Sequence, residues 1–203
     1  MTARFAPPPD HAGDPVGVSG WRTLPNLLTL VRLLLVPVLG VLLFAQDGTD
    51  PALRWWATAV FVVAAITDLL DGELARRSGT VTTVGKIADP IADKAITAVA
   101  LIGLSALGDL PWWVTIVILA RELGVTALRF WVIRHGVIPA SRGGKAKTVA
   151  QIIAIALYLA PLPDAIDPLR ILAMAIAVIL TVVTGIDYAV RAWRLRQAGR
   201  MTP

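Results

Sequence analysis

The chain has 203 residues, of which 56% are hydrophobic, and its formal net charge is +5. Soluble domains are about 45–50% apolar, and the long apolar runs that recur along this sequence exclude an ordinary soluble domain and predict a polytopic membrane protein. Because the chain has no cysteine, it cannot form a disulfide, a zinc–thiolate site or a thiol nucleophile.

Residues 1–20 are rich in Pro and Gly and show no hydrophobic period, which predicts a disordered cytoplasmic tail. They do not resemble a secretory signal, because the apolar run begins only near Leu27. We expect one membrane domain over residues 21–195 and a second cytoplasmic tail over 196–203, with no soluble domain and no internal repeat.

Six segments have about the 20 mostly apolar residues that a membrane-spanning helix needs. They are residues 25–45, 54–77, 85–107, 111–134, 146–162 and 168–192. The fifth segment is the shortest, and the sequence PLPDAIDP closes it. The predicted fold is therefore an all-α membrane protein with six transmembrane helices.

The distribution of Lys and Arg predicts that both termini are cytoplasmic. With that orientation the outer loops carry only Arg54 and Arg170. The inner segments carry Arg4, Arg22, Arg76, Arg77, Lys86, Arg134, Arg142, Lys145, Lys147, Arg191, Arg194, Arg196 and Arg200. Tryptophan pairs also open segments 54–77 and 111–134 on the proposed outer side, as an aromatic belt requires.

Four aspartates lie where the second segment ends and the third begins, in DLLDGELARRSGTVTTVGKIADPIADK. Asp68 and Asp71 are three residues apart, and Asp89 and Asp93 are four apart. Each spacing places both residues on one face of a helix. With the predicted orientation, the two faces meet at the cytoplasmic surface of the bilayer.

Four neighbouring carboxylates repel one another, so the cluster predicts bound cations. Ligand sets made only of oxygen suit Mg²⁺, Mn²⁺ or Ca²⁺, and two pairs of carboxylates suit two metal ions that hold phosphoryl oxygens. Gly72 would let a ligand approach the backbone, and Arg76 could bind a phosphate. The alternative is that these groups are simply solvated at a membrane interface, although apolar residues continue beyond Asp68 and Asp93.

The fixed spacing of these residues resembles the signature of the CDP-alcohol phosphotransferase family. The matching positions are Asp68, Asp71, Gly72, Ala75, Arg76, Gly85, Asp89 and Asp93. The stretches LPNLLTLVRLLLVP, ILARELGVTALR and GGKAKTVAQ resemble the subfamily that makes phosphatidylglycerophosphate, and its actinobacterial members in particular. This resemblance extends from about Leu24 to Tyr188.

The resemblance implies transfer of the phosphatidyl group of CDP-diacylglycerol to sn-glycerol 3-phosphate, giving phosphatidylglycerophosphate and CMP. It implies two Mg²⁺ or Mn²⁺ ions per site, a homodimer, and a multi-pass protein of the cell membrane. We expect the partners to be these two substrates, the lipid bilayer and a second copy of the chain, and no nucleic acid.

The resemblance also implies roles for individual residues. Asp68, Asp71, Asp89 and Asp93 would hold the metals, and Asp93 would also be the general base that deprotonates the acceptor hydroxyl. The CDP part of the lipid would be bound by Asn26, Thr29, Gly72, Arg76 and Thr82.

We expect the acceptor phosphate to be bound by Arg121, Lys145, Lys147 and Arg142. Arg121 lies well inside an apolar span, where an arginine indicates function and where its partner would be Glu122, an aspartate of the cluster or the phosphate. Lys145 and Lys147 are expected to open a helix after a Gly143-Gly144 turn, and a helix N-terminus attracts phosphate. For Arg142 the alternative of attraction to lipid headgroups is the stronger one.

Other functions remain open from the residues alone. A same-family enzyme with another acceptor would be a cardiolipin synthase or a phosphatidylinositol phosphate synthase, and the signature does not separate these. A remote alternative is a divalent-cation transporter, although such sites favour the membrane midplane and inverted repeats. The roles of Arg32, Lys94, Arg129 and Asp187 are not fixed by the sequence. Arg32 could pair with an interior acid or bind the pyrophosphate, and Lys94 could only balance the charge of Asp93. Asp187 is expected either to pack against an arginine or to touch the site.

Overall fold

The structure is a computed structural model that describes residues 24–78, 85–132 and 142–198. For residues 24–29, 68–78, 85–93, 129, 130, 132, 142 and 198 it describes the backbone alone. The described residues form six α-helices and two short 3₁₀ turns and contain no strand, which confirms the all-α prediction. The helices are α1 (Leu24–Phe44), α2 (Pro51–Ser78), α3 (Gly85–Ala106), α4 (Trp112–Val132), α5 (Arg142–Leu159) and α6 (Asp167–Ala198), and the turns are Ala45–Gly48 and Asp164–Ile166.

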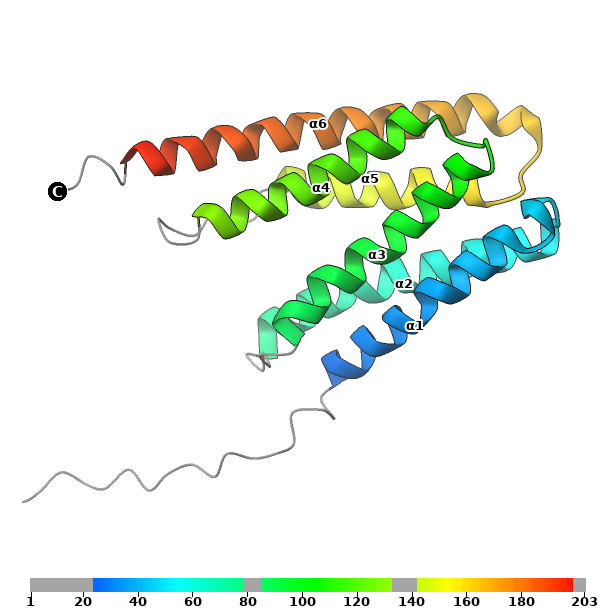
Figure 1. Cartoon of the computed structure of the whole chain (residues 1–203), viewed down its shortest axis with the longest axis horizontal. Coiled ribbons are helices and arrows are strands. Elements are labelled where there is room, and N and C mark those ends of the chain that lie inside the picture. The colour runs from blue at the N-terminus through cyan, green and yellow to red at the C-terminus, as the bar shows by residue number, and fades with distance from the viewer. Residues whose placement is uncertain (1–23, 79–84, 133–141, 199–203) are drawn as a thin grey trace, which may run out of the picture.

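The helices form two packed groups (Figure 1). Helix α1 packs on α2 and α3, whereas α4 and α5 each pack on α6. Contacts of α5 with α2 and α3, and of α4 with α3, join the two groups. The α1–α2, α3–α4 and α5–α6 connections lie at one end of the bundle, called here the distal end; α2 ends and α3 begins at the opposite, motif end.

The predicted segments match the helices to within four residues, except that α6 ends at Ala198 and not near residue 192. Helix α2 begins at Pro51 because Asp50 caps it: Asp50 Oδ1 accepts hydrogen bonds from the backbone N–H of Ala52 (2.7 Å) and Leu53 (3.0 Å). An acid followed by proline is a strong helix start. The predicted Gly143-Gly144 turn is wrong, because both glycines lie in the first turn of α5. Glycine costs about 1 kcal/mol within a helix, which tertiary packing readily overcomes.

Helix α3 ends in a Schellman motif around Gly108. Gly108 adopts φ = 86°, a conformation that glycine enters without penalty. The N–H of Gly108 donates to the carbonyl of Ser105 (3.2 Å), and the N–H of Asp109 donates to the carbonyl of Leu104 (2.9 Å). These are the two bonds that define this cap. The cap stops the helix and brings Asp109 to the distal end, where it pairs with Arg54 at 2.7 Å.

The helices contact one another through apolar side chains and a few buried hydroxyl and amide groups. Leu39, Phe61, Leu101, Ile118 and Ile155 are fully or almost fully buried in one cluster that draws on every helix. Between helices, Ser105 Oγ and Thr115 Oγ1 share a hydrogen bond of 2.7 Å, and Gln151 Nε2 donates to Thr181 Oγ1 at 2.8 Å. Interhelical hydrogen bonds of this kind are typical of helix packing in membranes.

Among the described residues, two segments are long and apolar enough to cross a bilayer, Leu30–Gly48 and Asp164–Gln197. Shorter apolar helical stretches are Pro51–Thr67 and Lys94–Ala106. Many large apolar side chains face outward, including Val41, Trp56, Ile116 and Ile179, each 60% or more exposed. The number of spans and their orientation stay predictions. The predicted tail 1–20 lies outside the described residues, as do residues 199–203 of the predicted tail 196–203, and α6 continues into that second tail as far as Ala198.

Candidate active site

The four aspartates of the motif lie on two helices that pack against each other. Asp68 and Asp71 belong to the C-terminal half of α2, and Asp89 and Asp93 belong to the first turns of α3. Both pairs are therefore in helical register, and each pair shares one face of its helix. The four side chains lie outside the described residues, so the predicted metal site stays a prediction.

Most of the residues predicted to bind CDP lie on the same group of helices. Asn26 and Thr29 belong to the first turns of α1, and Gly72 and Arg76 belong to α2; only their backbones are described. Thr82 lies outside the described residues. Because α1 packs on both α2 and α3, the fold brings these predicted binding segments to the motif end together with the aspartates.

Next to the motif, four charged side chains from three helices converge; we call them the Glu122 cluster. Its members are Lys94 of α3, Arg121 and Glu122 of α4, and Lys147 of α5. Glu122 Oε1 accepts hydrogen bonds from Lys147 Nζ and from Arg121 Nη1, the latter at 3.1 Å. Lys94 Nζ lies 3.9 Å from Glu122 Oε2. The Lys147 side chain is only 5% exposed and the Glu122 side chain 18%, so these charges are largely removed from solvent.

Hydroxyl groups and a glycine hold the cations of the cluster in place. Thr126 Oγ1 accepts a hydrogen bond from Lys94 Nζ, and Arg121 Nη2 donates to Thr184 Oγ1 of α6 at 3.0 Å. A Cβ atom at Gly185 would lie 3.0 Å from Arg121 Cγ. Because Gly185 has no side chain, the Arg121 side chain can pack directly against α6 at this position.

The structure brings together two of the four residues predicted for the acceptor phosphate. Arg121 and Lys147 both contact Glu122, which confirms Glu122, one of the three expected alternatives, as a partner of Arg121. Lys145 lies two residues earlier on α5 with an exposed side chain, whereas Lys147 is buried. Only the backbone of Arg142 is described. Of the two lysines predicted for the acceptor phosphate, the buried Lys147 is therefore the one that belongs to the cluster.

Sequence reasoning missed several residues of this region. Lys94 appeared only to balance the charge of Asp93, but it reaches across to α4. Thr126 follows Glu122 by four residues, so the helical period could have predicted that both lie on the same face of α4. Thr184 and Gly185 carried none, because their contact with Arg121 depends on how α4 packs on α6.

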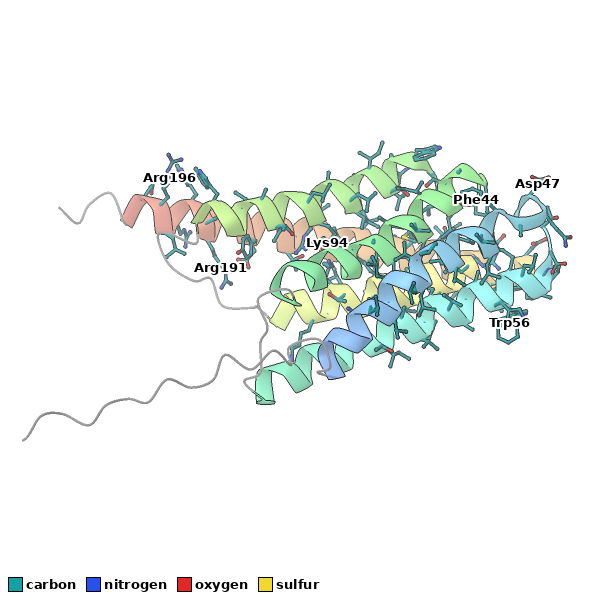
Figure 2. The ribbon with its side chains drawn as sticks, turned by 60° about the horizontal axis from the view of Figure 1, so that its bottom comes forward. Phe44, Asp47, Trp56, Lys94, Arg191 and Arg196 are labelled. Carbon is teal, nitrogen blue, oxygen red and sulfur yellow. The ribbon has the colours of Figure 1, made fainter. Side chains whose placement is uncertain are left out.

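Other charged residues lie on α1, α4 and α6. Asp187 pairs with Arg191 one turn along α6 at 3.0 Å, and both side chains are about half exposed, so the expectation that it packs against an arginine is confirmed. Figure 2 shows Arg191 and Arg196 at the motif end of α6, with Lys94 farther into the bundle. Arg32 is buried on α1 at 3% exposed. The side chain of Arg129 is not described.

The Glu122 cluster has the composition of an anion-binding site. Its four side chains carry three positive charges and one negative charge, a net charge of +2. A guanidinium has five N–H donors and an ammonium three. Arg121 uses two donors and Lys147 one in bonds to described residues. Such groups can bind a phosphate through charge-assisted hydrogen bonds.

Comparison with known proteins gives a consistent assignment. A sequence profile described as CDP-alcohol phosphatidyltransferase matches residues 22–183. The chain is 53% identical to "Probable phosphatidylglycerophosphate synthase" of Mycobacterium tuberculosis, over 91% of this chain and 88% of that protein.

Two further relatives share the name "CDP-diacylglycerol--glycerol-3-phosphate 3-phosphatidyltransferase". The Bacillus subtilis protein is 39% identical over 84% of this chain and 95% of its own length. The Escherichia coli protein is 37% identical over 66% of this chain and 74% of its own length. The match covers the signature residues of α2 and α3 and continues through the Glu122 cluster, and the chain therefore belongs to the CDP-alcohol phosphatidyltransferase family.

Proposed function

We propose that the protein transfers the phosphatidyl group of CDP-diacylglycerol to sn-glycerol 3-phosphate, producing phosphatidylglycerophosphate and CMP. The observation that carries this proposal is the Glu122 cluster, whose Lys94 follows Asp93 directly on α3. The predicted base, Asp93, is thus adjacent in sequence to Lys94 of a basic cluster that could bind a phosphorylated alcohol. The names of the relatives support the same two substrates.

We infer that all six helices span the cell membrane, with both termini and the motif end in the cytoplasm. The asymmetry of Lys and Arg supports this orientation. Such an arrangement lets the acyl chains of the lipid substrate stay in the bilayer while its CDP group meets a water-soluble acceptor at the motif end. The resemblance to the family further supports a homodimer with one active site in each subunit.

The motif suits divalent metal ions by the chemistry of its donors. Asp68, Asp71, Asp89 and Asp93 offer only carboxylate oxygens, from two helices that pack together, and such hard ligands suit Mg²⁺ or Mn²⁺. When bound, two such ions would neutralise the diphosphate and stabilise the negative charge that develops on the leaving CMP.

The chain's own residues would bind both substrates and move one proton. Asn26, Thr29, Gly72, Arg76 and Thr82 would bind the CDP group. Asp93 would take the proton of the acceptor hydroxyl. The hydroxyl oxygen would then bond to the phosphatidyl phosphorus, and the bond from that phosphorus to CMP would break. A general base of this kind contributes about 10²–10⁴ to the rate.

We place the acceptor phosphate against Arg121 and Lys147, with Lys145 and Arg142 at the entrance to the site. Burial of Lys147 supports its direct role, because a buried ammonium strengthens its interaction with a dianion relative to an exposed one. The exposure of Lys145 suits a role in attracting the acceptor from solution.

The test is transfer of label from CDP-diacylglycerol by the purified protein in detergent, with Mg²⁺ or Mn²⁺ and with a chelator. Glycerol 3-phosphate, phosphatidylglycerol and inositol phosphate are offered in parallel. We expect metal-dependent phosphatidylglycerophosphate formation with glycerol 3-phosphate alone. Product with another acceptor would refute the assigned acceptor, and no transfer from folded protein would refute the proposed reaction.

A further inference from the structure

Glu122 is the shared partner of three basic side chains that come from three helices. Arg121 precedes it on α4, Lys94 reaches it from α3, and Lys147 reaches it from α5. A carboxylate has two oxygens and about four acceptor positions, so it can hold several cations at once. Glu122 is therefore the point at which the helix that carries Asp89 and Asp93 is joined to α4 and α5.

The link between Glu122 and Lys147 joins two helices that are otherwise apart. Along their described residues the backbones of α4 and α5 do not approach closely, and each packs on α6 instead. Between them, at this level, lie the side chains of Glu122 and Lys147. Without the carboxylate, no negative charge would separate the buried ammonium of Lys147 from the cations Arg121 and Lys94, and like charges repel strongly where solvent is excluded.

The bonds to Glu122 still leave donors for a ligand. Among the described residues Lys147 donates only to Glu122, and Arg121 donates to Glu122 and Thr184. The four side chains of the cluster carry a net charge of +2, which is equal in magnitude and opposite in sign to the charge of a phosphate monoester dianion. A phosphodiester carries a single negative charge and would leave the cluster unbalanced.

We propose that Glu122 is a positioning residue of the acceptor site: it holds Arg121 and Lys147, together with Lys94, so that the remaining N–H groups of Arg121 and Lys147 are aligned for a phosphate monoester before that ligand arrives. The inference rests on the proposed function, because it assumes that the acceptor phosphate binds at this cluster. It adds the claim that an acidic residue strengthens the binding of an anion. A residue that only supplied negative charge would weaken that binding.

The experiment compares steady-state kinetics of the full-length wild-type protein and E122Q in detergent with Mg²⁺. We expect E122Q to raise KM for glycerol 3-phosphate about 10- to 100-fold, the loss typical of misplaced binding groups. KM for CDP-diacylglycerol should stay unchanged, because four of the five residues predicted to bind CDP lie on α1 and α2, which do not contribute to the cluster. The matched control is D167N, which removes the partner of Arg170 at the distal end and should change neither KM.

A double variant tests whether Glu122 acts through Lys147. If it does, E122Q/K147M should raise KM for glycerol 3-phosphate by clearly less than the product of the two single effects. E122D is the second single variant, in case E122Q does not fold; its shorter side chain keeps the charge but not the reach to Lys147, so we expect an intermediate KM.

The outcomes separate the two claims. Three results would overturn the positioning role while the reaction stands. They are an unchanged or lowered KM for glycerol 3-phosphate in E122Q and E122D, an equal rise in the KM values of both substrates, and fully additive effects in E122Q/K147M. If the wild-type protein does not use glycerol 3-phosphate, the proposed function fails, and the inference that rests on it fails too.

Discussion

At the scale of single residues, we expect one set of groups to hold the donor lipid and another set to hold the acceptor. Asp93 and Lys94 are adjacent on α3, one predicted to act on the acceptor hydroxyl and the other contacting α4 through Thr126. Adjacent residues on a helix point about 100° apart, so a single turn of α3 can serve both the metal side and the acceptor side of the site.

We expect Asp93→Asn to lower kcat by at least about 10²-fold, because asparagine cannot accept the proton and is a weaker metal ligand. Labelled transfer to glycerol 3-phosphate, at saturating concentrations of both substrates, measures the effect. Asp164→Asn is the control, since Asp164 is exposed at the distal end. Retention of more than a tenth of wild-type kcat by Asp93→Asn would contradict the assignment of the base.

Lys147→Met should raise KM for glycerol 3-phosphate about 10- to 100-fold, since a hydrogen bond to a charged group contributes about 1.5–3 kcal/mol. The apolar side chain has similar length, which limits the effect on packing. Arg191→Met is the control, because the Arg191–Asp187 pair on α6 is exposed. Equal KM values for the two variants would place the acceptor phosphate elsewhere.

At the scale of elements, the proposed acceptor site depends on how α4 packs on α6. Arg121 passes α6 at Gly185 and is held there by Thr184, so the helix pair sets the position of the guanidinium. At the motif end the same two helices are joined again, because the Arg196 guanidinium lies 4.3 Å from the centre of the Trp131 ring.

Gly185→Ala should weaken acceptor binding, because the added methyl group would lie 3.0 Å from Arg121 Cγ and push the guanidinium out of place. We expect KM for glycerol 3-phosphate to rise several-fold and the melting temperature in detergent to fall, with overpacking costing about 1–3 kcal/mol. Gly124→Ala on α4 is the matched control, since nothing lies within 4 Å of its new Cβ. It should be neutral or slightly stabilising; the same KM increase in both variants would exclude a specific effect on Arg121.

Arg54 stabilises the distal end by joining three elements. Its Nε donates to the carbonyl of Leu159 (3.1 Å) and its Nη2 donates to that of Tyr158 (3.0 Å), while it also pairs with Asp109. The carbonyls at the end of α5 have no partners within their own helix. One buried guanidinium thus caps α5 and ties it to α2 and to the α3–α4 connection.

Arg54→Lys should destabilise the protein by about 1–3 kcal/mol, because an ammonium lacks the planar fork that makes these bonds together. Thermal unfolding in detergent measures this loss, and kcat of the folded fraction should be unchanged. Arg191→Lys, at an exposed ion pair, should shift stability by less than about 0.5 kcal/mol. Equal shifts for both variants would show that Arg54 contributes no more than a surface charge.

At the scale of the whole molecule, function depends on which end of the bundle faces the cytoplasm. Figure 2 shows Asp47 and Trp56 at the distal end, opposite Arg191 and Arg196. Exposed tryptophans, including Trp55, Trp56, Trp112 and Trp113, begin α2 and α4 at that distal end. These positions suit the outer interface of a membrane.

Because the chain has no cysteine, single cysteines can report this orientation without background. A membrane-impermeant maleimide should label Thr49→Cys in intact cells, since Thr49 is exposed at the distal end. Gln197→Cys, exposed at the motif end of α6, should be labelled only after the membrane is permeabilised. The reverse pattern would place the motif outside the cell.

The sequence by itself determined the helices, the signature and the family. Long apolar runs with few breaks leave a helix as the only way to satisfy the backbone in lipid, so the six segments could be predicted to within a few residues. The spacing of the aspartates depends only on the helical period, so the fixed gaps from Asp68 to Asp93 identified the motif without any structure.

Only the tertiary structure decided the composition of the Glu122 cluster. Lys94, Glu122 and Lys147 lie on three different helices, and Thr184, which accepts a hydrogen bond from Arg121, lies on a fourth, so no local period relates them. The choice of the buried Lys147 over the exposed Lys145 depends on which face of α5 packs inward. The contacts of such residues arise from the packing of whole helices, which side-chain spacing along one chain segment cannot specify.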